Sequence, residues 1–266
     1  MNEHEEFQLL YPSVFPVTVP ILVNYETGRD DLGAGVLVEI SDRLFVATAA
    51  HCIEEKPRIL KDHFYLPYDD ESIQILDRGT DDDLDVGFLE LKNDPSIPTI
   101  ARARWSLDQI HVGDPPKPSD GMLFVVGFPV SGRTNSPQLL EVRKEGLGSR
   151  MNRAEDTFYF LEYPAMGWKN DAKTGGFVEV PFPETPVGFS GGGWWAFFPQ
   201  KDGEVFYPQK YIRLYAIQSS WFSKSRLVKC VPMIHWLRLV ATACPDLRES
   251  LIERFPVLSE LPLSGR

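Results

Sequence analysis

The amino-acid sequence predicts an all-β protein that is built from two halves and ends in a helix. Most of the chain consists of short apolar runs of strand length, separated by residues that favour turns. Three prolines fall within residues 112–120, a stretch that suits neither a helix interior nor a central strand and therefore predicts the connection between the halves. A length of 266 residues is ordinary for a single all-β domain.

The first half contains five predicted strands, at residues 17–23, 35–40, 44–48, 72–76 and 86–91. Pro20 lies inside the first of them. Because proline has no backbone N–H to donate, this strand is expected at a sheet edge. The regular alternation of short strands and turns predicts a first barrel.

The second half contains six predicted strands, at residues 122–127, 139–142, 157–163, 177–180, 193–198 and 211–218. They predict a second barrel, with residues 167–176 as a surface loop. Ile234, Leu237 and Val240 recur at helical spacing and predict a helix over residues 231–240.

The expected organisation is a single domain over residues 1–245, with the boundary between its barrels near residues 112–120. Residues 246–266 are expected to form a C-terminal extension with a short helix of its own.

The composition excludes several classes of function. A net charge of −11 and an isoelectric point near 5.0 argue against nucleic acid or an anionic membrane surface as the partner, because lysine and arginine drive such binding. No apolar run approaches the roughly 20 residues that span a bilayer. Residues 1–6 lack the pattern of a signal peptide, so a cytoplasmic protein is expected.

The cysteines and histidines predict no disulfide framework and no metal. Cys52, Cys230 and Cys244 are odd in number, and a paired framework would need an even set. The histidines are scattered, without the paired spacing of a metal site. No cofactor is expected.

Three short motifs contain the residue types of a serine hydrolase. They are Thr48-Ala49-Ala50-His51-Cys52, Asp85-Val86-Gly87-Phe88-Leu89-Glu90-Leu91 and Gly188-Phe189-Ser190-Gly191-Gly192. A serine hydroxyl needs an imidazole to accept its proton, and the imidazole needs a carboxylate to hold its tautomer. The order His, Asp, Ser differs from that of nucleophile-elbow hydrolases and from that of subtilisin-like enzymes.

In this order the motifs resemble those of the trypsin-like (chymotrypsin-fold) serine peptidases, over roughly residues 17–240. The resemblance implies an all-β, chymotrypsin-like double β-barrel with a C-terminal helix. It also implies a serine endopeptidase that cleaves protein or peptide substrates through an acyl-enzyme, without a cofactor. His51 would be the general base, Asp85 its orienter and Ser190 the nucleophile, with the N–H groups of Gly188 and Ser190 as the oxyanion hole.

Each motif also has an ordinary structural interpretation. A histidine after a strand is often only a strand-end residue, and glycine clusters are common in loops. Asp85 belongs to an acidic run of the kind found in solvated loops, in which Asp83 is the nearest rival. Asp85 is preferred because an apolar strand follows it directly.

The cleavage preference stays open at this stage. By resemblance, Glu184 would lie at the base of the primary pocket and favour Lys or Arg, although the prolines around it favour a purely structural role. Ser220 and Trp221 resemble the Ser-Trp pair that lines the substrate strand. Phe222 follows where glycine is usual, which would narrow the pocket and favour small side chains.

Two alternative functions are kept beside the endopeptidase. One is a binding module that retains the barrels but has lost catalysis. The other is an esterase-like hydrolase that uses the same acyl chemistry.

We predict that activity does not depend on cleavage of the N-terminus. Secreted relatives carry an aspartate before the nucleophile that pairs with a newly cut N-terminus, whereas this chain has Phe189. Control would have to come from a loop, a ligand or an activating partner. Chains that lack the first few residues should retain full activity in a turnover assay, and strict dependence on a new N-terminus would refute this.

Overall fold

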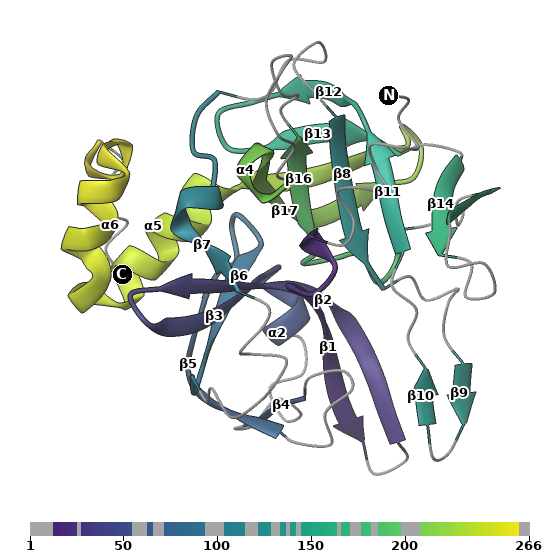
Figure 1. Ribbon diagram of the computed structural model, residues 1–266, viewed down its shortest axis with the longest axis horizontal. Helices are drawn as coiled ribbons and strands as arrows, with labels where there is room; N and C mark the ends of the chain where they lie inside the picture. Colours follow the sequence, from purple (N-terminus) through teal and green to yellow (C-terminus); the bar gives the residue numbers. More distant parts are fainter. Residues whose placement is uncertain are drawn as a thin grey trace.

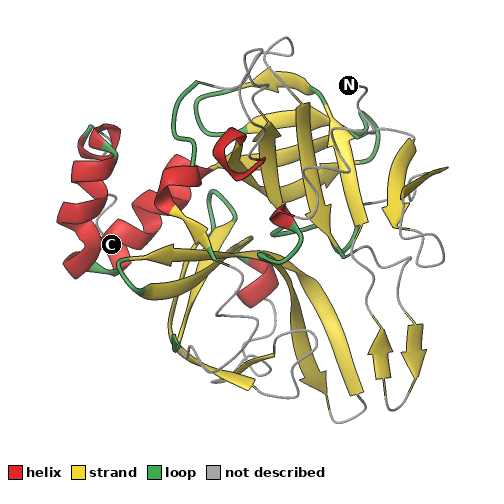
Figure 2. Ribbon diagram, viewed as in Figure 1, coloured by secondary structure: helices red, strands yellow, loops and turns green. Residues whose placement is uncertain are grey.

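The computed structural model describes residues 13–25, 28–54, 63–65, 72–93, 104–114, 122–128, 134–136, 139–141, 145–163, 166–170, 177–181, 186–197 and 208–260. Within them, two sheets face each other, antiparallel except for one short parallel pair in the first, and helices close one side (Figures 1 and 2). No helix in these ranges is long and apolar enough to cross a membrane.

The first sheet has seven strands and is formed by the N-terminal half. Its path is β1 (Thr18–Tyr25), β2 (Gly28–Ile40), β3 (Arg43–Thr48), β6 (Val86–Leu91), β5 (Ser72–Asp81) and β4 (His63–Tyr65), and the short β7 (Trp105–Ser106) pairs with β2. All five strands predicted for this half are present. The prediction for Pro20 is also confirmed, because β1 lies at the end of this path.

The second sheet has nine strands. Their order is β12 (Met151–Ala154), β13 (Tyr159–Glu162), β18 (Leu227–Pro232), β17 (Ile212–Phe222), β16 (Gly193–Phe197), β8 (Met122–Gly127), β11 (Glu145–Ser149), β14 (Met166–Asn170) and β15 (Phe177–Pro181). A separate hairpin joins β9 (Thr134–Ser136) to β10 (Leu139–Glu141).

The strand predicted at residues 139–142 for the second barrel is β10 of the separate hairpin, outside the nine-stranded sheet. Two other predictions for the second half need correction. The loop expected at residues 167–176 begins as a strand, because β14 pairs with β15 through five residues from Met166 to Asn170; residues 171–176 lie outside the described ranges. The helix expected from residue 231 begins only at Met233, because Val231 and Pro232 still belong to β18. In both places strand pairing outweighs the local pattern.

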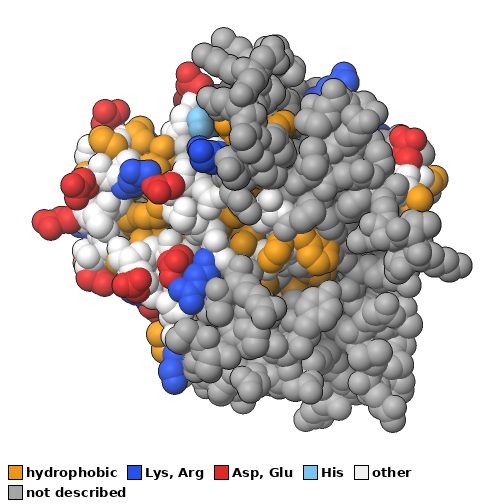
Figure 3. Space-filling model, viewed as in Figure 1, with side chains coloured by type: hydrophobic (Ala, Val, Ile, Leu, Met, Phe, Trp, Pro, Cys, Tyr) orange, Lys and Arg blue, Asp and Glu red, His pale blue; other side chains and the backbone are white. Residues whose placement is uncertain are grey.

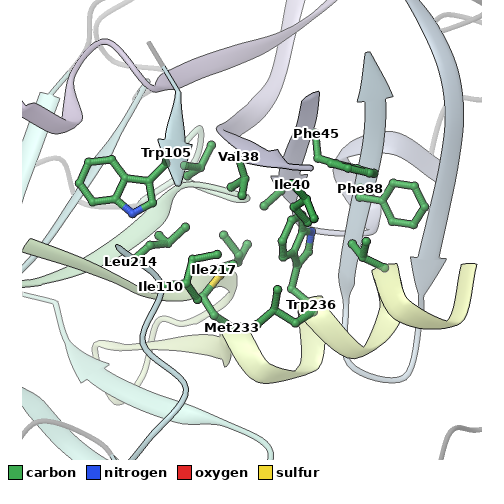
Figure 4. Packing of buried hydrophobic residues seen from close by; sticks show 14 of the residues in the cluster. Val38, Ile40, Phe45, Phe88, Trp105, Ile110, Leu214, Ile217, Met233 and Trp236 are labelled. Carbon is green, nitrogen blue, oxygen red and sulfur yellow. The ribbon is translucent and has the colours of Figure 1, made fainter. Parts of the chain in front are cut away.

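The side chains form three apolar clusters, one inside each barrel and one between them. The first-barrel cluster includes Leu37, Val46 and Leu89, and the second-barrel cluster includes Val125, Phe189 and Trp194. The cluster between the barrels is the largest, and Figure 4 shows Val38 and Phe45 of the first sheet facing Leu214 and Ile217 of the second.

The C-terminal helix α5 (Met233–Ala243) seals this central cluster. Trp236 is fully buried, donates its indole N–H to the Gly87 carbonyl at 3.2 Å and packs edge-on against Phe45. The chain continues through α6 (Arg248–Arg254), and Leu251 and Phe255 pack into the same cluster.

The connection between the halves and the outer face of the helices complete the fold. Ile110 bridges to Leu214, and the His111 N–H donates to the Leu214 carbonyl at 2.9 Å, so the first half passes directly onto β17. Residues 115–121 of the predicted connection lie outside the described ranges. Figure 3 shows acidic side chains at the left of the view, on the side where Figure 1 draws α6. Glu249 and Glu253 of α6 are exposed.

We predict that Trp236→Ala lowers the free energy of unfolding by about 3–5 kcal/mol, because it removes a fully buried indole and leaves a cavity between α5 and the first sheet. Denaturant unfolding measures the change. Trp236→Phe should lose less than the alanine variant, and Glu249→Ala, on an exposed surface of α6, should be close to neutral. Equal losses for the two Trp236 variants would contradict this account.

Candidate active site

His51 is the first residue of α2 (His51–Glu54), directly after the buried strand β3. Its ring Nδ1 lies 2.9 Å from Asp85 Oδ1 and 3.0 Å from Oδ2. The His51 backbone N–H also donates to Asp85 Oδ1, at 3.1 Å. The ring and the backbone of His51 therefore both contact the Asp85 carboxylate, which fixes the position of the imidazole relative to it.

Asp85 occupies the turn between β5 and β6 with a positive φ of 59°. This left-handed conformation is tolerated better by aspartate and asparagine than by most residues. Asp81 supports the turn by accepting the Leu84 N–H at 3.1 Å. Of the two candidates in the acidic run, Asp85 contacts His51, whereas Asp83 is exposed.

Ser219 is a site residue that the sequence reasoning missed. Its hydroxyl donates to Asp85 Oδ2 at 2.5 Å, and the predicted Ser220 lies one residue further, with its Oγ 3.1 Å from that of Ser219. The pairing of β17 with β18 shifts register between Gln218 and Ser220. The sequence indicated only that two serines lie side by side. The register shift decides which of them donates a hydrogen bond to Asp85.

The turn that carries Ser190 depends on two glycines. The Phe189 N–H donates to the Pro186 carbonyl at 3.0 Å, and the Gly192 N–H donates to the Phe189 carbonyl at 2.8 Å. Gly188 and Gly191 hold the third positions of these two turns, with φ values of 95° and 80°. A third-position φ above zero is what a type II turn requires, and glycine adopts it without steric cost.

The Ser190 turn docks on the first barrel close to His51. The Ala34 N–H donates to the Ser190 carbonyl at 2.7 Å, and the Cys52 thiol lies 3.6 Å from the same oxygen. A Cβ on Gly191 would collide with the Ala34 carbonyl and the Thr48 hydroxyl. Ser190 is thus brought beside the residue that follows His51.

Two features of the described residues bear on the chemistry of Ser190. No hydrogen bond joins its hydroxyl to His51 there, a looseness that resting enzymes can show. Among the same residues, neither the Gly188 N–H nor the Ser190 N–H donates a hydrogen bond. Among the described residues, the two N–H groups predicted for an oxyanion hole are therefore not already engaged by another acceptor.

The electrostatics couple His51 to Asp85. The hydrogen bond to Asp85 is the main cause that raises the pKa of His51 to about 10. Burial by itself would raise the pKa of Asp85, but hydrogen bonds from His51 and Ser219 outweigh it and hold that pKa below its ordinary value. The pair therefore favours imidazolium beside carboxylate.

The structure describes some of the residues that the sequence predicted to bind substrate, but not all of them. Trp221 packs against Tyr163 with ring centroids 4.7 Å apart, at the edge of the second-barrel cluster. Phe222, the next residue, is 44% exposed and lies against Phe160 with ring centroids 6.0 Å apart. Glu184 lies outside the described residues.

One cluster of possible metal ligands occurs in the described part of the chain, at Asp77, Glu90 and Cys244. The Arg43 guanidinium already contacts Glu90 through two nitrogens, at 2.7 and 2.5 Å, and reaches Cys244 Sγ at 3.4 Å. Arginine supplies the positive charge in this cluster, so it is explained as a structural ion pair.

Comparison with known proteins identifies the fold through a solved structure and not through sequence. No protein-family model matches the sequence, and no curated protein does either. Among solved structures, the chain is similar to the active form of the Rv3671c protease from M. tuberculosis, with 12% identity and a TM-score of 0.50, over 90% of this chain and 86% of that one. The fold is a chymotrypsin-like double β-barrel. This confirms the fold class predicted from the sequence.

We predict that Asp85→Asn lowers the pKa of His51 from about 10 towards the ordinary value of about 6.5, because the amide keeps the backbone turn but removes the negative charge. NMR titration of the histidine ring signals measures the midpoint. His235 serves as an internal control, since burial is the main cause that lowers its pKa. An unchanged His51 midpoint would disprove the coupling.

Proposed function

We propose that this protein is a serine endopeptidase whose nucleophile is Ser190. The observation that carries the proposal is the chain of contacts from Ser219 through Asp85 to His51, next to the glycine turn that presents Ser190. The likeness of the fold to that of a protease supports it. The substrates would be proteins or peptides.

The first step is acylation. The Nδ1–H of His51 donates to Asp85, which leaves the Nε2 lone pair free to accept the Ser190 proton. The serine oxygen bonds to the substrate carbonyl carbon, and the N–H groups of Gly188 and Ser190 stabilise the oxyanion that forms. The C–N bond then breaks as His51 returns the proton to the leaving amine, and Ser190 is left as an ester.

Water completes the cycle. His51 takes a proton from the attacking water, the ester C–O bond breaks, and the proton passes to Ser190, which releases the substrate acid. Only neutral His51 can act as the base. Because its pKa is raised to about 10, acylation should become faster as the pH rises from neutral.

The chemistry of the site also suits an ester substrate. Comparing the turnover of ester and peptide substrates distinguishes the two: turnover of esters alone would assign an esterase-like hydrolase. The absent Ser190–His51 hydrogen bond is the observation that favours the other alternative, a binding module without catalysis.

We predict that a fluorophosphonate probe labels Ser190 covalently. This reagent needs an activated serine but no knowledge of the substrate. Mass spectrometry of the modified peptide should place the label on Ser190, and both Ser190→Ala and His51→Ala should reduce it to background.

Matched controls come from the same regions of the chain. Ser225→Ala removes an exposed turn hydroxyl, and Asp83→Asn neutralises the rival carboxylate; both should label like the wild type. The labelling rate should rise with pH. An unlabelled wild type, or a label that persists in Ser190→Ala, would overturn the proposal and favour the binding module.

A further inference from the structure

Gln218 lies between the Ser190 turn and Asp85. Its carbonyl accepts the Gly191 N–H at 2.8 Å, and its own N–H donates to the Gly192 carbonyl at 2.9 Å. The next residue along β17 is Ser219, which bonds to Asp85. Both backbone hydrogen-bonding groups of Gln218 are therefore bonded to the glycines that follow Ser190.

The side chain of Gln218 is buried on the inner face of the second barrel. Gln218 is only 2% exposed, and it pairs across the sheet with Cys230, a member of the second-barrel cluster. Side chains of paired residues lie on the same sheet face. The carboxamide therefore faces the same apolar interior as Trp194, whose indole approaches the Cys230 thiol.

The amide oxygen of Gln218 has no hydrogen-bond partner in the described part of the chain, although it is buried. Buried polar atoms are almost always paired, because an unpaired one loses its water without compensation. Apolar residues of similar size fill such positions without this cost. An acceptor kept here, beside the nucleophile, suggests that its partner arrives with the substrate.

A second unpaired atom occurs three residues further along the same strand. The indole N–H of Trp221 is also buried and without a partner among the described residues. β17 thus offers one acceptor, on Gln218, and one donor, on Trp221, on either side of the two serines. The apolar side chains around them include Tyr163, which packs on Trp221 and has the Arg226 guanidinium over its ring, 5.6 Å from the centroid.

We propose that Gln218 determines specificity by accepting a hydrogen bond from the substrate residue whose carbonyl group acylates Ser190. The preferred side chain of that substrate residue is a carboxamide, that of Gln or Asn. A carboxamide carries an N–H donor and a carbonyl acceptor on separate atoms. It can therefore serve Gln218 and Trp221 together, whereas an ammonium or guanidinium group offers donors alone. This inference rests on the proposed peptidase function.

The test compares three peptides that differ only in this substrate residue, which is Gln, Met or Lys. Methionine has nearly the size of glutamine but no N–H. For the wild-type protein, kcat/KM for the Gln peptide should exceed that for the Met peptide by about tenfold, the worth of one well-placed hydrogen bond. The Lys peptide should be cleaved more slowly than the Gln peptide.

Gln218→Met removes the acceptor but keeps the backbone bonds to the Ser190 turn. It should bring the Gln and Met peptides to similar kcat/KM values, and fluorophosphonate labelling of Ser190 checks that the variant protein is folded and reactive. The matched control is Asn93→Leu. Asn93 Oδ1 is also buried and has no partner in the described ranges, but Asn93 follows β6 at the opposite end from Asp85, so this variant should keep the wild-type preference.

The outcomes separate the two proposals. Labelling of Ser190 with equal rates for the Gln and Met peptides, or with faster cleavage of the Lys peptide, overturns the role of Gln218 but leaves the peptidase standing; the Lys result would favour the Glu184 expectation instead. Absence of labelling overturns both. The comparison of peptides on the wild-type protein stands even if Gln218→Met fails to fold.

Discussion

The Ser190 carbonyl accepts the Ala34 N–H at 2.7 Å, and this bond joins the Ser190 turn of the second barrel to the first barrel, which carries His51 and Asp85. The approach is close enough that only a glycine fits at position 191. Together with the approach of the Cys52 thiol to the same oxygen, this contact sets how Ser190 lies relative to the imidazole. A site divided between two barrels can be no more rigid than the junction that joins them.

The central apolar cluster also holds the two barrels together. Side chains from both sheets meet there, and α5 packs along the open side with Trp236 against Phe45 (Figure 4). The Trp236 indole also bonds to the Gly87 carbonyl, two residues after Asp85. Packing in the interior thus fixes the position of β6, the strand that begins directly after Asp85.

Phe189 is the second residue that holds the Ser190 turn in place. The ring is fully buried in the second-barrel cluster and lies so close to Gly127 that a Cβ there would approach its Cδ1 to 2.6 Å. Ser190 is therefore held on one side by an apolar side chain and on the other by the bond to Ala34. An apolar anchor of this kind does not titrate, so it holds the turn over a wide range of pH.

The sequence by itself determined the fold class and most of the strands, because short apolar runs separated by turn residues can bury one face only in sheets. It also identified His51 and Asp85, whose contact the structure shows, since the acid begins a buried strand. Tertiary structure alone decided that Ser219 and not Ser220 reaches Asp85, because the register shift in β17 depends on pairing with β18. For the same reason β14 replaced part of a predicted loop, and the Gln218 amide oxygen came to be buried without a partner among the described residues. Hydrogen-bond partners distant in sequence are set by packing, which no local pattern encodes.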